Sequence, residues 1–131
     1  MKKILLYLVL FSLMSCDQDD TNNIGSSGYF VRYDVSCRCN GDAFRSSGRA
    51  DITISYTGGS SVKAKNVASY TWTTTKGPFK KGAGVSLTVS PKIIRGTSVT
   101  TNASISVSKD GGPFVTKASK NYAGSISYNI K

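Results

Sequence analysis

Three cysteines and no histidine limit the chemistry that this chain of 131 residues can perform. Cys37 and Cys39 lie two residues apart on a segment that alternates like a strand, and an oxidising compartment would favour a disulfide between them. On an extended strand, however, their Cα atoms are ~6.6 Å apart and their side chains are parallel. A bridge needs Cβ atoms within ~4.5 Å, so the chain would have to bend, and Asn40-Gly41 could supply the bend. A local Cys37–Cys39 disulfide and two core thiols therefore both stay open.

The same composition argues against a metal centre and against common catalytic arrangements. Two thiolates are half of a tetrahedral metal site, and no histidine exists to complete it. Ser-His-Asp and Cys-His nucleophiles cannot be assembled without histidine. Asp51 at a strand start and Asp110 in a turn already have structural roles, so we do not expect them to act as catalytic carboxylates. A glycine-rich phosphate-binding loop would need a helix behind it, and the sequence predicts none. We expect no enzyme activity, no metal and no cofactor.

A strong excess of positive charge is the main sign of a binding function. Residues 28–131 hold fifteen Lys and Arg against four Asp, a net charge near +11. Such a charge attracts phosphate, sulfate, lipid headgroups or acidic glycans, although it would also serve solubility near an envelope. The candidate anion-binding residues are those around Gly77-Pro78-Phe79 with two later cations: Lys76, Lys80, Lys81, Lys92 and Arg95. Lys117 and Lys120 would join them if the fold brings these segments together. The alternative is a solvated loop in which Phe79 packs against the edge of the domain.

The N-terminus has the organisation of a secretion signal. Lys2 and Lys3 precede an apolar run over residues 4–14, which is far shorter than the ~20 residues that span a bilayer. Leu13-Met14-Ser15-Cys16 resembles the lipobox of bacterial lipoprotein precursors. That resemblance implies a signal peptide over 1–15, cleavage before Cys16, and a diacylglyceryl group and fatty acid such as palmitate on that cysteine. Two or three acyl chains anchor a protein stably, at ~0.8 kcal/mol per buried CH₂. The alternative is an ordinary secretory signal with an incidental cysteine.

An acidic cluster directly follows the anchor cysteine. Asp17, Asp19 and Asp20 resemble the surface-export signal of lipoproteins in the Bacteroidetes. The polar composition of residues 16–27 predicts a tether that cannot bury enough surface to fold. We expect the chain in the cell envelope, at the outer membrane or cell surface, held to the membrane through lipid on Cys16.

Alternation with period two is the dominant pattern in the remaining segment, residues 28–131, and predicts the elements that must position these side chains. Apolar and polar residues alternate, or nearly so, over 29–39, 50–56, 70–73, 85–90, 103–108, 115–118 and 126–130, as in antiparallel strands with one buried and one solvated face. Gly58-Gly59 and Asp110-Gly111-Gly112 predict hairpin turns, and Gly77-Pro78 and Gly96 predict further breaks. No segment has a helical apolar stripe. The prediction is one all-β domain, an antiparallel β-sandwich of immunoglobulin-like type with about seven strands.

Several motifs that cover most of the domain follow one another in a recognisable order: Phe30-Val31-Arg32-Tyr33-Asp34-Val35, Ala50-Asp51-Ile52-Thr53-Ile54-Ser55-Tyr56, Asn66-Val67, Tyr70-Thr71-Trp72, Gly82, Val85-Ser86-Leu87 and residues 103–112. Their order and spacing resemble the periplasmic β-sandwich of the MmpS family, accessory proteins of mycobacterial lipid and siderophore exporters, and the resemblance implies an MmpS-like β-sandwich. Small Bacteroidetes lipoproteins are built in the same way. The MmpS proteins are anchored by a transmembrane helix, whereas this chain has a lipobox. The resemblance implies an accessory role and no catalytic residues.

Together these features lead to one main hypothesis and one alternative. We expect a lipid-anchored, non-enzymatic binding or interaction module of the cell envelope. Its expected partners are an anionic glycan, a lipid headgroup or an envelope protein, and not nucleic acid. The alternative is a structural accessory subunit of an envelope transporter or surface assembly.

Overall fold

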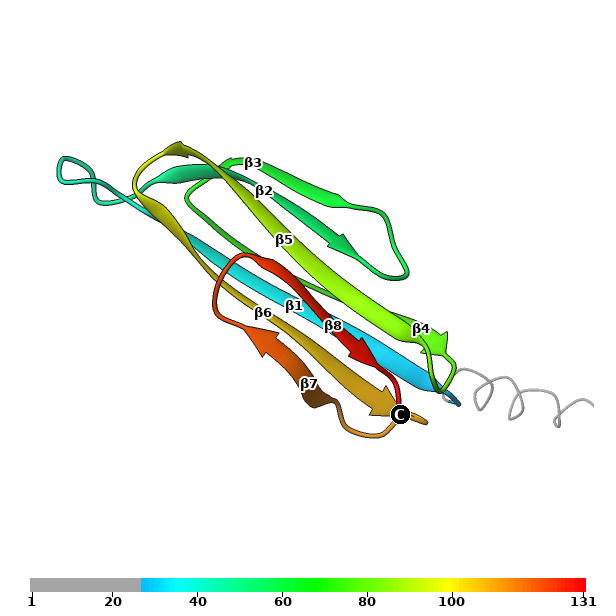
Figure 1. The fold of residues 1–131 in the computed structure, drawn as a ribbon. Coiled ribbons are helices and arrows are strands. Elements are labelled where there is room, and N and C mark those ends of the chain that lie inside the picture. Colours follow the sequence, from blue (N-terminus) through cyan, green and yellow to red (C-terminus); the bar gives the residue numbers. More distant parts are fainter. Residues whose placement is uncertain (1–26) are drawn as a thin grey trace, which may run out of the picture.

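The computed structural model describes residues 27–131, which form eight β-strands and no helix (Figure 1). The predicted signal peptide over 1–15, the lipidated Cys16 and the sorting residues Asp17, Asp19 and Asp20 lie outside the described residues. The prediction of an all-β antiparallel fold is confirmed. The strands are β1 (Tyr29–Asn40), β2 (Arg49–Tyr56), β3 (Val62–Val67), β4 (Ser69–Phe79), β5 (Gly84–Arg95), β6 (Ser98–Lys109), β7 (Val115–Lys120) and β8 (Gly124–Asn129).

The strands form two four-stranded sheets that face one another as a sandwich. One sheet has the order β4-β1-β6-β7 and the other β3-β2-β5-β8, and every neighbouring pair is antiparallel. Only the β2–β3 and β6–β7 connections stay within a sheet. The other connections cross between the sheets, so strands adjacent in the sequence mostly belong to opposite sheets.

The core lies between the two central pairs of strands, β1 with β6 and β2 with β5. Its buried apolar side chains come from alternate positions of those strands and from Ile130: Val31, Tyr33, Val35, Cys37, Cys39, Ala50, Ile52, Ile54, Val85, Leu87, Val89, Ala103, Ile105 and Val107. Each fully buried Val, Ile or Leu contributes about 1.5–3 kcal/mol relative to an exposed one. The inward-facing apolar side chains of the predicted alternation therefore stabilise the fold directly.

One of the eight strands, β3, was not among the seven predicted strands. It reads Val-Lys-Ala-Lys-Asn-Val, and its two lysines are exposed while Val62 and Ala64 are half-buried against the core. β3 is an edge strand, paired only with β2. Lysine on an edge strand opposes pairing with another chain. The strand was missed because its apolar and polar residues alternate over only four positions, 62–65, before Asn66, which has a positive φ of 52°.

The turns follow the glycines with one exception. Gly58-Gly59 lies in the β2–β3 hairpin and Asp110-Gly111-Gly112 in the β6–β7 hairpin, as predicted. The predicted break at Gly77-Pro78 is wrong, because β4 continues through both residues to Phe79. A proline is tolerated there because β4 is an edge strand, so one side of its backbone needs no partner.

Two serines predicted on a solvated face are buried instead. Ser106 and Ser108 are each at most 2% exposed. The Ser106 hydroxyl lies 3.3 Å from the Thr116 hydroxyl, and that of Ser108 donates to the Gly112 carbonyl at 2.6 Å. The register of β7 shifts at this point, and the connection after β6 folds back over the outer face of the sheet. Its Phe114 ring lies under the Arg32 guanidinium, 4.9 Å from the ring centroid.

The sandwich is elongated, with a proximal and a distal end along its long axis. The proximal end is where β1 begins: Tyr29 pairs with Phe79 and Lys109, and Asn129 at the end of β8 pairs with Gly84 nearby in the sheet opposite. The distal end is where β1 finishes: Asn40 pairs with Ser98, and Arg49 pairs with Arg95. A twelve-residue strand such as β1 is about 40 Å long, and it separates these ends.

Candidate functional site

The two cysteines of β1 are free thiols in the core. Each is 3% exposed. The Cys37 sulfur lies 3.8 Å from the Thr101 hydroxyl, and the Cys39 thiol donates to the Val67 carbonyl at 3.3 Å. Burial raises the pKa of both thiols, which disfavours the reactive thiolate. Of the two alternatives that the sequence leaves open, this structure has the pair of core thiols.

The five candidate anion-binding residues do not form one patch. Lys76, Lys80 and Lys81 belong to the end of β4 and the connection that follows it, at the proximal end. Lys92 and Arg95 lie at the end of β5, beside the start of β2, at the distal end. The interpretation of these residues as a single site is therefore wrong, because β5 runs the length of the sandwich between them.

The aromatic residue of the basic loop is not a binding side chain. Phe79 is half-buried and packs against the core cluster. It pairs with Tyr29 of β1 at the sheet edge. Its role is to close the proximal end of the sandwich, as in the alternative considered from the sequence.

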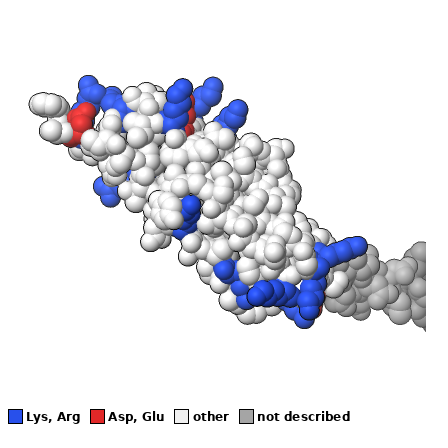
Figure 2. Space-filling model, in the orientation of Figure 1, with Lys and Arg blue, Asp and Glu red and all other residues white. Residues whose placement is uncertain are grey.

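The cations of the described chain gather at the two ends of the sandwich. On the face shown in Figure 2, blue atoms lie mostly toward the two ends, with a smaller blue group between them. Lys120, which pairs with Ala103 at mid-length of β6, belongs to neither end. The strand pairings place six lysines toward the proximal end: Lys76, Lys80, Lys81, Lys109, Lys117 and Lys131. They place seven cations toward the distal end: Arg38, Arg45, Arg49, Lys63, Lys65, Lys92 and Arg95.

The four aspartates of residues 27–131 all hold structural hydrogen bonds. Asp34 pairs with Arg32 at 3.0 Å and accepts from Thr73 at 2.8 Å, and it is part of the one ion pair within this stretch. Asp51 accepts from the Asn66 amide at 2.8 Å, and Asp42 from the Phe44 amide at 3.0 Å. Asp110 accepts from the Gly28 amide at 2.7 Å, while its own amide donates back to the Gly28 carbonyl at 2.8 Å. None of these acids forms an ion pair with a lysine of residues 27–131.

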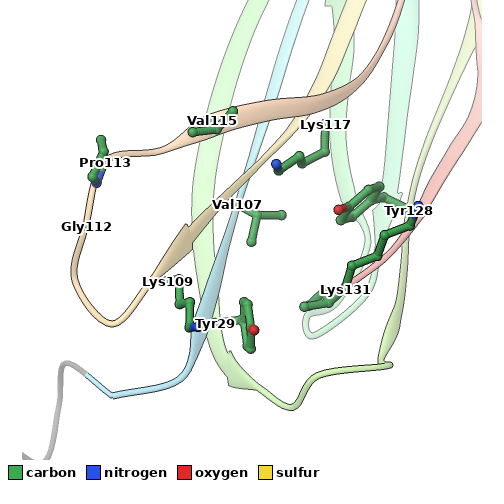
Figure 3. Close-up of a pocket in the computed structure, with 10 residues that line it drawn as sticks. Tyr29, Val107, Lys109, Gly112, Pro113, Val115, Lys117, Tyr128 and Lys131 are labelled. Carbon is green, nitrogen blue, oxygen red and sulfur yellow. The ribbon is translucent and has the colours of Figure 1, made fainter.

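A cleft at the proximal end brings together three lysines, one of which, Lys117, the sequence had offered as an addition to the basic loop. It has a volume of about 510 Å³ and is lined by residues of β1, β6, β7 and β8 with the segments that follow β6 and β8 (Figure 3). Lys109, Lys117 and Lys131 line it together with Tyr29 and Tyr128. Lys109 and Lys131 were missed because their proximity depends on which strands are neighbours. The position of Lys109 directly before the Asp110 turn was the one available signal.

The distal end has a different character, with exposed apolar side chains among its cations. Phe44, in the connection between β1 and β2, is 95% exposed. Ile93 and Ile94 near the end of β5 are about half exposed. A second cavity, of about 230 Å³, includes Lys63, Lys65 and Lys92 but also Asp51, so its charge is mixed.

Two further observations apply to the described stretch alone. No three His, Cys, Asp or Glu side chains of residues 27–131 come close enough to hold a metal ion. None of those residues belongs to a helix of the length and apolarity needed to cross a bilayer.

Comparisons with known proteins add no assignment. The chain matches no protein-family model, no curated protein and no solved structure.

Proposed function

We propose that this chain is a lipid-anchored, non-enzymatic binding module of the cell envelope that recognises anionic envelope components. The observation that carries the proposal is the charge of the described residues. Residues 28–131 contain fifteen cationic side chains but only four aspartates. Each aspartate is held in a structural hydrogen bond. One cation, Arg32, is in an ion pair within residues 27–131. The remaining charge is available to an anionic partner.

The distribution of the charge supports binding over solubility. Charges that serve solubility are best spread over a surface with both signs interspersed. Here the cations concentrate at the two ends, while the outward positions between them are largely Ser and Thr (Figure 2). Concentrated charge of one sign raises the local potential and attracts polyanions.

The membrane part of the proposal rests on the N-terminal motif. Acylation of Cys16 would hold the domain at the outer membrane or cell surface. The described chain begins at the proximal end, beside Lys109. An envelope component that carries phosphate, sulfate or carboxylate groups would therefore meet a basic surface on either end of the anchored domain.

The test measures binding of the full chain, in detergent, to a polysulfated glycan (heparin) and to vesicles that contain phosphatidylglycerol. We expect binding at low ionic strength that weakens progressively as salt is raised toward ~0.5 M, because the Debye length falls from about 10 Å at 0.1 M to a few ångströms. Uncharged dextran and phosphatidylcholine vesicles are the controls. With vesicles, the signal is the binding to phosphatidylglycerol vesicles in excess of the binding to phosphatidylcholine vesicles, because the anchor inserts into both.

Equal binding to charged and uncharged probes at every salt concentration would overturn the proposal. Binding that requires charge but resists salt would also contradict it, since exposed lysines at the sandwich ends are screened by mobile ions.

A further inference from the structure

The proximal cleft combines an apolar wall with a cationic rim. Val107 and Ile130 are buried at its base, and the rings of Tyr29 and Tyr128 border it. Lys109, Lys117 and Lys131 come to the same space from three separate segments of the chain (Figure 3). Its volume of about 510 Å³ lies within the ~300–1,000 Å³ range of small-molecule sites.

No acidic side chain lines this cleft to offset the three lysines. The nearest aspartate along the chain is Asp110, next to Lys109, and its Oδ1 accepts the Gly28 amide hydrogen at 2.7 Å. The Lys109 ammonium lies 5.9 Å from the centroid of the Tyr29 ring, and none of the three lysines has an ion-pair partner among residues 27–131. An anion that enters would make charge-assisted hydrogen bonds without displacing an internal partner.

The combination selects an amphiphile over a free anion. A free phosphate would use the lysines and leave the apolar wall in contact with water. A phosphate joined to glycerol and hydrocarbon would contact the lysines with its headgroup and Val107, Tyr29 and Tyr128 with its carbon atoms. Burial of that apolar surface adds to the charge interaction, at about 25 cal/mol per Å².

The position of the cleft gives the source of such a ligand. Tyr29 lines the cleft and is thirteen residues beyond Cys16. A chain of that length spans at most ~45 Å even when fully extended. An acylated Cys16 would therefore keep the cleft within ~45 Å of the bilayer surface that holds the anchor, and the proximal end is the end attached to it.

We propose that the proximal cleft binds the headgroup and adjoining glycerol of an anionic phospholipid in the membrane that carries the anchor. This inference rests on the proposed function, and it narrows the partner to a lipid and the site to one end. Its consequence is that the proximal end docks on the membrane, which leaves the distal end with Phe44 directed away from it.

The experiment uses the full chain in phosphatidylcholine vesicles, with and without phosphatidylglycerol, and follows hydrogen exchange by mass spectrometry. We expect slower exchange in residues 109–118 and 126–131 on anionic vesicles only. The variant Lys109→Gln/Lys117→Gln/Lys131→Gln should lose this protection. The matched variant Arg45→Gln/Lys63→Gln/Lys65→Gln removes three charges from the distal half and should keep it. Circular dichroism confirms that both variants are folded.

The remaining arms separate the alternatives. Inorganic phosphate added to phosphatidylcholine vesicles should give no protection, and the same protection with phosphate alone would make a free anion the ligand and overturn the lipid proposal. Protection lost in the distal variant but kept in the cleft variant would refute the site and leave the proposed function standing. No charge-dependent protection, and no salt-sensitive binding to heparin, would refute both.

Discussion

At the scale of single residues, the core of this domain contains ionisable groups held in their neutral form. Tyr33 is fully buried, its hydroxyl donates to the Thr57 carbonyl at 2.8 Å, and its ring lies 5.3 Å from that of Tyr56. Burial raises the pKa of Tyr33 from 10.0 to about 12. The thiols of Cys37 and Cys39 are shifted in the same direction by the same cause. Each of these groups binds its proton more tightly in the folded chain than in the unfolded one.

Alkaline pH should therefore destabilise the fold through Tyr33. Above its unfolded pKa of 10.0 the unfolded chain loses the proton while the folded chain keeps it. The free energy of unfolding then falls as pH rises toward 12, by about 2–3 kcal/mol in total. Tyr33→Phe should remove this part of the decline, and it should cost about 1 kcal/mol at neutral pH because the Thr57 carbonyl loses its partner.

Urea unfolding at a series of pH values from 8 to about 11.5 measures both effects. The two thiols contribute the same decline in the wild type and the variant, so the difference between the two curves isolates Tyr33. Parallel curves for the two proteins would contradict the prediction.

At the scale of the elements, the connection between β5 and β6 has no room for a side chain at its glycine. Two residues, Gly96 and Thr97, carry the chain from one sheet to the other. Gly96 has a φ of 111°, and a Cβ atom there would overlap the Asn40 carbonyl oxygen. That oxygen already accepts the Thr97 amide at 3.1 Å, so the backbone has no room to move away.

Gly96→Ala should destabilise the sandwich by about 3–4 kcal/mol, the sum of a disfavoured backbone conformation and a clash with backbone. Gly82→Ala is the matched control, since Gly82 also has a positive φ, 89°, but no neighbouring atom lies within 4 Å of the place that an alanine methyl group would take. The control should cost only about 1 kcal/mol. Thermal unfolding followed by circular dichroism compares the two, and equal losses would show that the contact with Asn40 is unimportant.

At the scale of the whole molecule, the fold converts a uniformly basic composition into two separate charged ends. β4 ends among the proximal lysines and β5 ends among the distal cations, at opposite ends of a sandwich about 40 Å long. The proximal end has lysines around a cleft and the distal end has arginines, lysines and the exposed Phe44. An anchored domain of this shape can contact the membrane with one end and present the other to a second partner.

The anchor itself can be tested on the whole chain. If Cys16 is acylated, metabolic labelling with a palmitate analogue should mark the wild-type chain, and its N-terminal peptide should begin at Cys16 with the added mass of the acyl groups. Cys16→Ala should lose the label completely. Cys37→Ala removes a different cysteine and should keep it. An unmodified N-terminus in the mature chain would disprove the anchor.

Local sequence patterns were enough to predict the class of this fold and most of its strands. Alternation of apolar and polar residues is a local property, so it predicted the inward faces of β1, β2, β5 and β6, and the glycines predicted the hairpins. The prediction missed β3, a half-buried edge strand in which the alternation covers only residues 62–65. It also assigned Ser106 and Ser108 to the solvated face. Both are buried because they hydrogen-bond with Thr116 of β7 and Gly112 of the β6–β7 hairpin, contacts that alternation within β6 does not show.

The places where the charges gather depend on how distant strands pair. Lys76 and Lys92 are sixteen residues apart in the chain and at opposite ends of the sandwich, whereas Tyr29 and Lys131 are near the two limits of the described chain and line one cleft. The reason is physical: side-chain alternation specifies a face, but sheet order and register specify neighbours, and these depend on pairings between distant strands. The candidate site is a product of those pairings, while the fold class and the N-terminal motif could be read from adjacent residues.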